Sequence, residues 1–405
     1  MLGERIREIR KRKKMTLEAL AGDELTKGML SLIENNKANP SIESLSYIAG
    51  RLGVEVSELL EDISSQKLRA LLDEAEKIFN LNKAEVPNKF EQLIALIEPY
   101  IKSLSQGYES ARLLEIYCRS LYQEKQDGWQ ELSKKAANLY DDMNLTSKRA
   151  GIGIFWSMVK FIQHDYSGSL SIFLQERKQL EAKHHFIDPM TRVDLDYHEA
   201  ILHFAIGDSE AAAAVMKNAI QFSKEHRIFY RIDDLYRLAA AHGLMTKDKE
   251  QQQHYLLKLK QYGDFTEDEQ SLIFYDLFQA LSLNSEEEKY HEALGIIDKY
   301  LSDSKTDEDY RAWFLLEKGK SLFGLGRLYE ALVCLEEVEI PDYAHHPYDL
   351  SLFYIKDSYK ALCHAGLGNQ ERALREAKTA VKHFEEMPPT PYKEFALETY
   401  NSVKK

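Results

Sequence analysis

The sequence predicts an all-α protein in which a small domain of five short helices is followed by a long array of paired helices. Three observations predict this fold. The 405 residues include only nine prolines and nineteen glycines, and no long alternating run of Val, Ile and Thr is present. Apolar residues recur at helical spacing in short packets through the first sixty positions. A loose self-similarity then begins near Pro87, as expected for a repeat array.

Charge is distributed unevenly along the chain. Residues 1–40 contain nine Lys and Arg against six acidic residues, a balance of +3, so the remaining residues carry −16 of a chain total of −13. A basic head suits the phosphate backbone of a nucleic acid, whereas an acidic body does not. No signal peptide and no stretch near the roughly 18 apolar residues that span a bilayer is present, so we expect a cytoplasmic protein. Three widely spaced cysteines indicate buried, reduced thiols.

The head contains five packets of apolar residues, each eight to twelve residues long and too short to be a stable helix alone, so mutual packing must hold them. The packets are Leu2, Ile6 and Ile9; Leu17, Leu20 and Ala21; Met29, Leu30 and Ile33; Leu45, Ile48, Ala49 and Leu52; and Val56, Leu59 and Leu60. Thr16, Thr26 and Ser41 stand where N-caps are expected, because a hydroxyl there accepts from the free amides of the first turn.

These residues resemble the helix-turn-helix domain of the phage repressor and Cro family. The resemblance covers about residues 2–60, and it is carried by the basic first helix, the Thr that opens the second helix, and the stretches LSLIENNKANPS and LGVEVSELL. The sequence departs from the family at two places. Leu17 occupies the position of a usual phosphate-contacting Gln, and the turn between Ala21 and Thr26 is one residue shorter than usual.

In domains of this kind the N-terminal end of the third helix enters the major groove. Lys27 is expected to donate to guanine, Ser31 to bond to a base edge, and Gly28 to let the backbone approach closely. Glu34 is expected to pair with a basic residue of the first helix instead of contacting DNA. The full set of candidates for DNA contact is Thr26, Lys27, Gly28, Ser31, Asn35, Asn36, Lys37, Arg10 and Lys11, of which the last five suit phosphates best.

We expect residues 1–63 to form the DNA-binding domain, residues 64–86 a linker helix, and residues 87–405 a repeat domain. Within the repeat domain, GLGRLYEALVCLEEV (324–338) and GLGNQERALREAKTAV (366–381) share a small-residue turn and an Ala-Leu that opens a second helix. Equivalent Leu or Ala positions at 170, 212, 294, 332 and 374 are separated by 42, 82, 38 and 42 residues, and the gap of 82 fits two units.

The repeats resemble tetratricopeptide repeats. That resemblance implies a right-handed α-solenoid whose concave face, built from the first helix of each pair, binds peptides or protein segments. In RIFYRIDDLYRL, helical spacing is expected to place Arg227, Arg231 and Asp234 on neighbouring faces, where an Arg can hold a peptide carboxylate in a bidentate fork. A surface salt-bridge ladder is the alternative. Further peptide-binding candidates are Tyr197, Trp156 and Tyr275, although aromatic residues at helical spacing most often pack in a core.

Motifs for catalysis or metal binding are lacking. HEAILH, residues 198–203, resembles a zinc-protease helix, but its two histidines lie five residues apart, about 140° around a helix, and cannot share a metal. No phosphate-binding glycine loop, nucleophile elbow or kinase signature occurs. We therefore predict a protein that is not an enzyme and uses no metal or cofactor.

A repressor-type helix-turn-helix followed by a long repeat array resembles the peptide-pheromone regulators of Firmicutes, the Rap/NprR/PlcR/PrgX group, and its NprR-like members most. The resemblance implies a homodimeric or higher-order transcription regulator in quorum sensing. Its expected partners are double-stranded DNA with a palindromic operator and a short signalling oligopeptide in the concave groove, without a membrane. The alternative function is an array that binds a protein, sequestering or dephosphorylating a response regulator of a sporulation-type phosphorelay.

Overall fold

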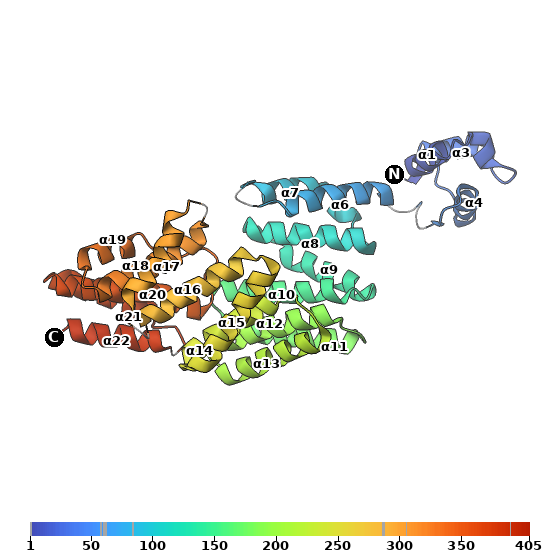
Figure 1. The fold of residues 1–405 in the computed structure, drawn as a ribbon. Helices are drawn as coiled ribbons and strands as arrows, with labels where there is room; N and C mark the ends of the chain where they lie inside the picture. Colours follow the sequence, from blue (N-terminus) through green and yellow to red (C-terminus); the bar gives the residue numbers. More distant parts are fainter. Residues whose placement is uncertain are drawn as a thin grey trace. The chain divides into compact units, whose positions relative to one another are not determined.

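The protein is described here by a computed structural model. It describes residues 2–56, 59, 63–82, 85–285, 288–304, 306–388 and 390–405. Every regular element in those ranges is a helix, which confirms the predicted all-α class (Figure 1). The chain divides into two compact units, Met1–Ile152 and Gly153–Lys405, which are taken in turn below. Within the described ranges, no helix is long and apolar enough to cross a membrane.

The first unit begins with four short helices in the region predicted as the DNA-binding domain: α1 (Leu2–Arg12), α2 (Leu17–Ala21), α3 (Lys27–Glu34) and α4 (Ile42–Leu52). Helix α2 has only five residues, fewer than predicted, because Gly22 follows it at φ 57°, a left-handed conformation that ends the helix. Of the fifth predicted packet, Leu59 is buried, while Leu60 lies outside the described residues.

The three predicted N-caps are confirmed. The hydroxyls of Thr16, Thr26 and Ser41 each accept a hydrogen bond from the backbone amide three residues further along the chain. Each bond satisfies one of the amides that the first turn leaves without a partner. The helix starts in this domain are therefore determined locally, by residues that sequence analysis alone can identify.

Apolar side chains from α1 to α4 form one core, which contains most of the predicted packets: Ile6, Ile9, Leu20, Ala21, Leu30, Ile33, Leu45, Ile48, Ala49, Leu52 and Leu59. Met29 was predicted to belong to it but is 40% exposed, because Leu30 and Ile33 define the inward face of α3. Helices α1 and α3 approach closely at Gly3, where a Cβ would lie 1.9 Å from the Ile33 carbonyl oxygen. Only glycine fits at that contact.

The rest of the first unit begins a stack of helices: α6 (Ser65–Phe79), α7 (Lys89–Ile97), the 3-10 helix η1 (Glu98–Ser103), α8 (Gly107–Gln123) and α9 (Trp129–Asp142). Helix α6, in the segment expected to be a linker, packs against both α7 and α8. The boundary expected at residue 63 and the linker expected over residues 64–86 stay predictions.

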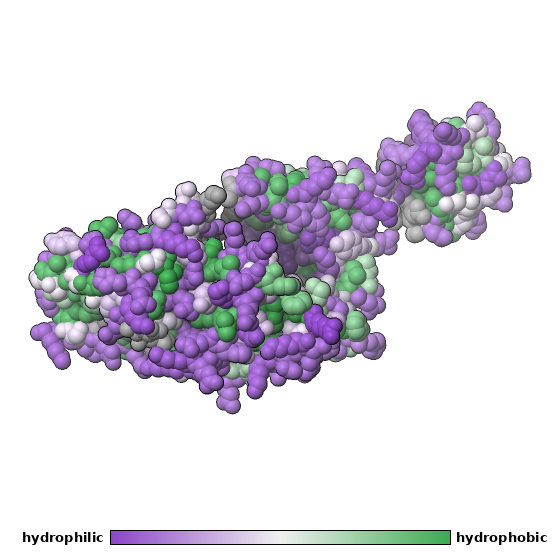
Figure 2. All heavy atoms as spheres, viewed as in Figure 1, coloured by the Kyte–Doolittle hydropathy of each residue, from purple (hydrophilic) through white to green (hydrophobic). Residues whose placement is uncertain are grey.

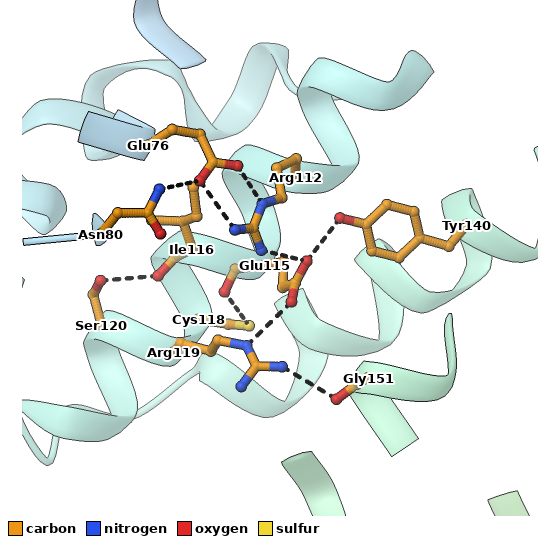
Figure 3. Close-up of polar contacts among 10 residues, drawn as sticks. All are labelled: Glu76, Asn80, Arg112, Glu115, Ile116, Cys118, Arg119, Ser120, Tyr140 and Gly151. Atoms are coloured by element: carbon orange, nitrogen blue, oxygen red, sulfur yellow. Dashed lines mark hydrogen bonds and ion pairs between the residues drawn. The ribbon is translucent and has the colours of Figure 1, made fainter. Parts of the chain in front are cut away.

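A buried polar network fastens α6 to α8 and α9 (Figure 3). The Arg112 guanidinium donates to the Glu76 carboxylate through Nε (2.6 Å) and Nη2 (3.1 Å), and its Nη1 lies 2.8 Å from Glu115 Oε2. Tyr140 donates its hydroxyl proton to Glu115 as well (2.8 Å). Burial by itself would raise the pKa of Glu115, but Arg119 and Arg112 hold that pKa below its ordinary value.

The helices that follow along the chain are α10 (Thr146–Ile162), α11 (Tyr166–Lys183), α12 (Pro189–Ala205), α13 (Ser209–His226), α14 (Ile232–Thr246), α15 (Lys249–Thr266), α16 (Glu269–Ser285), α17 (Tyr290–Ser302), α18 (Glu308–Gly324), α19 (Leu328–Glu336), α20 (Pro347–Gly366), α21 (Gln370–His383) and α22 (Pro391–Val403). Successive helices pack side by side from α11 onward (Figure 1). Several even-numbered helices also contact one another: α12 with α14, α16 with α18, and α18 with α20. We call the even-numbered helices from α10 to α20 the inner layer, because they supply most of the lining of two cavities. Figure 2 shows mainly hydrophilic side chains on the visible face over α13 and α14.

Small residues set how closely the helices of a pair approach, as the repeat pattern predicts. Ala212, Ala293, Ala331 and Ala373, near the starts of α13, α17, α19 and α21, are fully buried. At Gly243 in α14, a Cβ would lie 2.7 Å from the backbone nitrogen of Gln252 in α15. Because backbone atoms cannot turn aside as a side chain can, α14 and α15 keep this spacing only with glycine at that position.

We predict that Gly243→Ala destabilises the protein by about 2 kcal/mol, because the added methyl group overpacks a backbone contact. The matched control is Gly295→Ala, at an exposed helical glycine of α17 where an added Cβ meets nothing within 4 Å. That change is expected to stabilise by up to about 1 kcal/mol through helix propensity. Thermal unfolding followed by circular dichroism measures both, and equal melting temperatures for the two variants would contradict the prediction.

Candidate DNA-contacting surface and ligand cavity

The outer face of α3 carries the residues predicted to contact bases. Lys27 and Gly28 are exposed and Ser31 is half-buried. Met29 and Leu32, 40% and 45% exposed, lie among them. Apolar side chains in this position can contact the methyl group of thymine. Sequence analysis missed Met29 because it lies next to core residue Leu30, and only its angular position on α3 separates the two.

Lys27 forms an ion pair with Glu18 of α2, and both side chains remain about 60% exposed. Such an exposed pair contributes little to stability, so the lysine can exchange this partner for another acceptor. Thr26 uses its hydroxyl to cap α3 and positions the first turn.

The prediction that Arg10 contacts phosphate has to be corrected. Its side chain is only 11% exposed, and its Nε and Nη2 donate to the Glu34 carboxylate at 2.6 and 2.8 Å. Nη1 donates to the Met15 carbonyl oxygen (2.9 Å). The guanidinium is therefore fully engaged inside the domain, where it joins α1 to α3. This geometry confirms the predicted structural role of Glu34, which pairs with a basic residue of the first helix.

The other phosphate candidates surround the end of α3 and the end of α1. Asn35 and Lys37 are exposed, as is Lys11. Asn36 is exposed too, but its side-chain oxygen accepts from the Gly3 amide (2.9 Å) and so holds α1 against α3. Figure 2 shows hydrophilic side chains over much of the visible face of this domain. The described residues therefore leave Lys11, Asn35 and Lys37 available at the surface.

Two adjoining cavities, of about 340 and 480 Å³, open on the inner layer of the second unit. They share six lining residues, Arg237, Ala241, Phe274, Tyr343, Tyr348 and Asp349. Apart from Asp307, Tyr343 and His346, every lining residue comes from an even-numbered helix between α10 and α20. The first helices of the pairs thus build the cavity walls, at volumes typical of ligand sites in proteins.

A contact between distant parts of the chain lies beside the larger cavity, whose lining includes Phe161 and His346. The Tyr166 hydroxyl, at the start of α11, donates to the His345 carbonyl oxygen (2.8 Å), 179 residues away. The rings of Phe161 and His346 lie 6.0 Å apart beside it. This contact holds the segment before α20 in place, and Tyr343 and His346 of that segment line the cavities.

Asp349 and Arg237 are the charged residues common to both cavities. Burial raises the pKa of the Asp349 carboxyl to about 7. Nη2 of Arg237 donates to the Ser271 hydroxyl (3.2 Å) and lies 3.5 Å from Asp233 Oδ2 and 3.8 Å from Asp268 Oδ2. Its buried Nε has no hydrogen-bond partner among the described residues. Burial lowers the pKa of the lining residues His198, His242 and His346, which favours their neutral forms.

Of the residues predicted to bind a peptide, Tyr197 and Asp234 line the larger cavity. Tyr275 is half-buried beside Phe278 and Ala240, and Trp156 is half-buried in α10; neither lines these two cavities. Their roles stay predictions.

The expected arrangement of Arg227, Arg231 and Asp234 is wrong. Arg227 and Arg231 adopt left-handed conformations, φ 54° and 62°, because a turn between α13 and α14 interrupts the predicted helix. Arg227 is exposed, while Arg231 pairs with Asp194 (2.9 Å) and Asp234 (2.9 Å). These carboxylates already occupy the Arg231 guanidinium, so the three residues do not form a carboxylate clamp.

The described residues contain no group of three or more His, Cys, Asp or Glu that could hold a metal ion. Cys118 and Cys363 are buried and Cys334 is half-buried, and all three are free thiols. Burial raises the pKa of each thiol, to about 12 for Cys118 and about 11 for Cys363. The thiolate, which is the reactive form, is therefore disfavoured.

Comparison with known proteins identifies the N-terminal region. A family described as "Helix-turn-helix domain" matches residues 3–64. Residues 3–64 are a helix-turn-helix domain. The chain is also 40% identical over 60 residues to the immunity repressor protein of Bacillus phage phi105, a match that covers 15% of this chain and spans 42% of the length of that repressor.

Two solved structures resemble longer parts of the chain. One is Bacillus thuringiensis PlcR in complex with the peptide PapR7 and DNA, at 18% identity, covering 66% of this chain and 95% of that chain with a TM-score of 0.35. The other is NprR in complex with its cognate peptide NprX, at 14% identity, covering 83% of this chain and 82% of that chain with a TM-score of 0.48. Both proteins are named in the group that the sequence resembles.

We predict that Arg10→Met destabilises the helix-turn-helix domain by about 3 kcal/mol, because it leaves the buried Glu34 carboxylate without its cation. Hydrogen–deuterium exchange over residues 2–56 of the full chain reports this local loss of stability. Lys11→Met removes an exposed neighbouring charge and is expected to change stability by less than about 0.5 kcal/mol. Equal exchange protection in the two variants would show that the buried ion pair does not hold α1 to α3.

Proposed function

We propose that this protein is a DNA-binding transcription regulator whose activity is set by a short peptide bound in the cavities of its helical array. The observation that carries the proposal is the combination, in one chain, of a helix-turn-helix domain with an exposed third helix and a layer of first helices that enclose ligand-sized cavities. The comparisons are consistent with this proposal: one relative is a phage repressor, and the structures of PlcR and NprR contain bound peptides.

For DNA binding, the support comes from the surface of α3. Its core face is taken by Leu30, Ile33 and Glu34, so the opposite face is free to enter a major groove. That face combines a donor, Lys27, a close-approach position, Gly28, and exposed apolar groups. Lys11 and Lys37 supply cations for the phosphates on either side. One such domain buries too little surface for tight specific binding, so we propose a homodimer or higher oligomer on a palindromic operator.

For ligand binding, the support comes from the cavity walls. They combine aromatic and aliphatic side chains with a few converging polar groups, the composition expected of a binding site for a small flexible molecule. An extended peptide offers apolar side chains to such walls and polar backbone groups to the few donors and acceptors. In this proposal, the array binds the peptide, and no catalysis is assigned to it.

Coupling between the two parts passes, in our proposal, through α6. The ion pair of Arg112 with Glu76 joins α6 to α8, and the hydrogen bond from Tyr140 to Glu115 joins α9 to α8. In this proposal, a movement of these helices therefore moves the point from which the DNA-binding domain extends. A peptide shifts DNA affinity only if it binds one arrangement of the array better than another. The alternative function, in which the array binds a response regulator, stays a prediction.

Selection of duplexes from random DNA with the full-length protein tests the transcription-factor proposal. We expect enriched sequences with two related half-sites about one helical turn apart or a multiple of it. Binding of the enriched duplex is then measured with and without pools of short synthetic peptides. If low salt yields no enriched sequence in the presence or absence of peptides, the protein is not a sequence-specific DNA-binding regulator.

We predict that Lys11→Ala and Lys37→Ala each weaken binding of a non-specific duplex, because each lysine is expected to neutralise one phosphate. The slope of log affinity against log salt should become shallower by about 0.9 for each substitution. Lys247→Ala, at an exposed lysine of the loop after α14, is the control, with no expected change in slope. Unchanged slopes for both DNA-domain variants would contradict the predicted phosphate contacts.

A further inference from the structure

We infer that the ligand of the array carries a cationic group, a lysine or arginine side chain or a free amine, which binds against the Asp349 carboxylate inside the adjoining cavities. This inference rests on the proposed function, because it concerns the ligand of the same cavities, and it adds the charge of that ligand.

The charges that line the cavities are unbalanced. Asp234, Asp307 and Asp349 are the acidic lining residues, and Arg237 is the one Lys or Arg among the lining residues. Arg231, which lies outside the lining, pairs with Asp234, and the remaining acids still outnumber the cations. Both partners of Arg237, Asp233 and Asp268, add further negative charge just behind it. Since burial keeps the lining histidines neutral, they do not offset this excess. The potential inside the cavities therefore favours a cation.

Among the acidic residues that line the cavities, Asp349 has no cation paired with it in the described part of the chain. Among the described residues, no hydrogen-bond or ion-pair partner is found for its carboxylate, although it is partly buried and lines both cavities. Asp234, by comparison, is neutralised by Arg231 at 2.9 Å. A buried carboxylate without a partner costs free energy, and a bound cation removes that cost. A cation next to Asp349 also lowers its pKa and so keeps it ionised.

Aromatic rings supply a second feature that suits a cation. Phe274, Tyr310, Trp313, Tyr343 and Tyr348 all line the smaller cavity together with Asp349. The negative faces of such rings attract ammonium and guanidinium groups, most strongly where water is excluded. The structure already contains one example of this interaction, since the Arg237 guanidinium lies 5.3 Å from the centre of the Phe274 ring.

A ligand carboxylate, by contrast, finds no suitable site here. Arg231 is held between Asp194 and Asp234, and the Arg237 guanidinium already faces two carboxylates. A further carboxylate near either arginine meets more negative than positive charge at short range. The cavities therefore favour a cation over a carboxylate. The sequence had predicted the opposite, an arginine clamp for a peptide carboxylate.

Binding of synthetic peptide pools to the full-length protein tests the inference. The pools share apolar positions and differ in one residue, Lys, Gln or Glu, and both peptide ends are blocked so that no terminal charge contributes. Peptides retained after gel filtration above neutral pH are quantified by mass spectrometry. The Lys pool is expected to be retained about ten-fold or more above the Gln pool, and the Glu pool below it.

Asp349→Asn should abolish the preference for Lys over Gln. Because it removes a partly buried carboxylate that has no cation beside it among the described residues, this variant is expected to have a melting temperature no lower than that of the unaltered protein. Asp264→Asn is the matched control: Asp264 is 53% exposed, pairs with Lys260 and lies outside the cavities, so the preference should persist.

Equal retention of the Lys and Gln pools, or a preference for Glu, overturns the inference and leaves the proposed function standing. A preference for Lys that survives in Asp349→Asn also overturns it, because another group then selects the charge. Retention of no pool at all contradicts peptide binding itself, and with it both proposals. The comparison of pools on the unaltered protein decides the charge preference even if a variant fails to fold.

Discussion

Close packing of helix against helix is the constraint on which the rest of this structure depends. Where a pair of helices approaches backbone to backbone, as at Gly243 against Gln252, the spacing leaves no room for even a methyl group. Buried alanines near the starts of the second helices have the same effect at successive pairs. Because each pair stacks mainly on its neighbours, this repeated spacing builds an inner layer of first helices, and the cavities are lined mainly by that layer.

Three buried cations in the two units are each paired with a carboxylate. Arg10 and Glu34 join α1 to α3, Arg112 joins α6 to α8, and Lys320 pairs with Glu317 at 2.7 Å in the interior of α18. In each case a cation lies within hydrogen-bonding distance of a carboxylate, as the cost of burying a charge requires. Asp349 departs from this pattern, since the described residues provide it with no cation. A departure of this kind is the observation on which the inferred cation site rests.

The sequence predicts those local features that depend on residues close together in the chain. The caps at Thr16, Thr26 and Ser41 and the apolar core of the DNA-binding domain follow from hydroxyl chemistry and from helical periodicity. The prediction of a continuous helix failed over Arg227 to Arg231, because these two residues adopt left-handed conformations and form a turn. No glycine or proline in this stretch indicates the turn in the sequence. Similarly, Arg10 looked like a surface cation, and only its partner Glu34, 24 residues away, reveals a structural role.

The sequence by itself determined that the chain is helical, that a basic helix-turn-helix domain precedes an acidic array, and that small residues recur where the second helices of the pairs begin, although it did not single out Gly243. Only the tertiary structure decided which side chains face the cavities, because that depends on contacts between residues far apart in the chain. The bond from Tyr166 to His345 is one such contact, and it holds the segment before α20 against the inner layer. Periodicity alone does not distinguish Asp349 from any other first-turn acid of a helix, whereas the structure places it in the lining of both cavities.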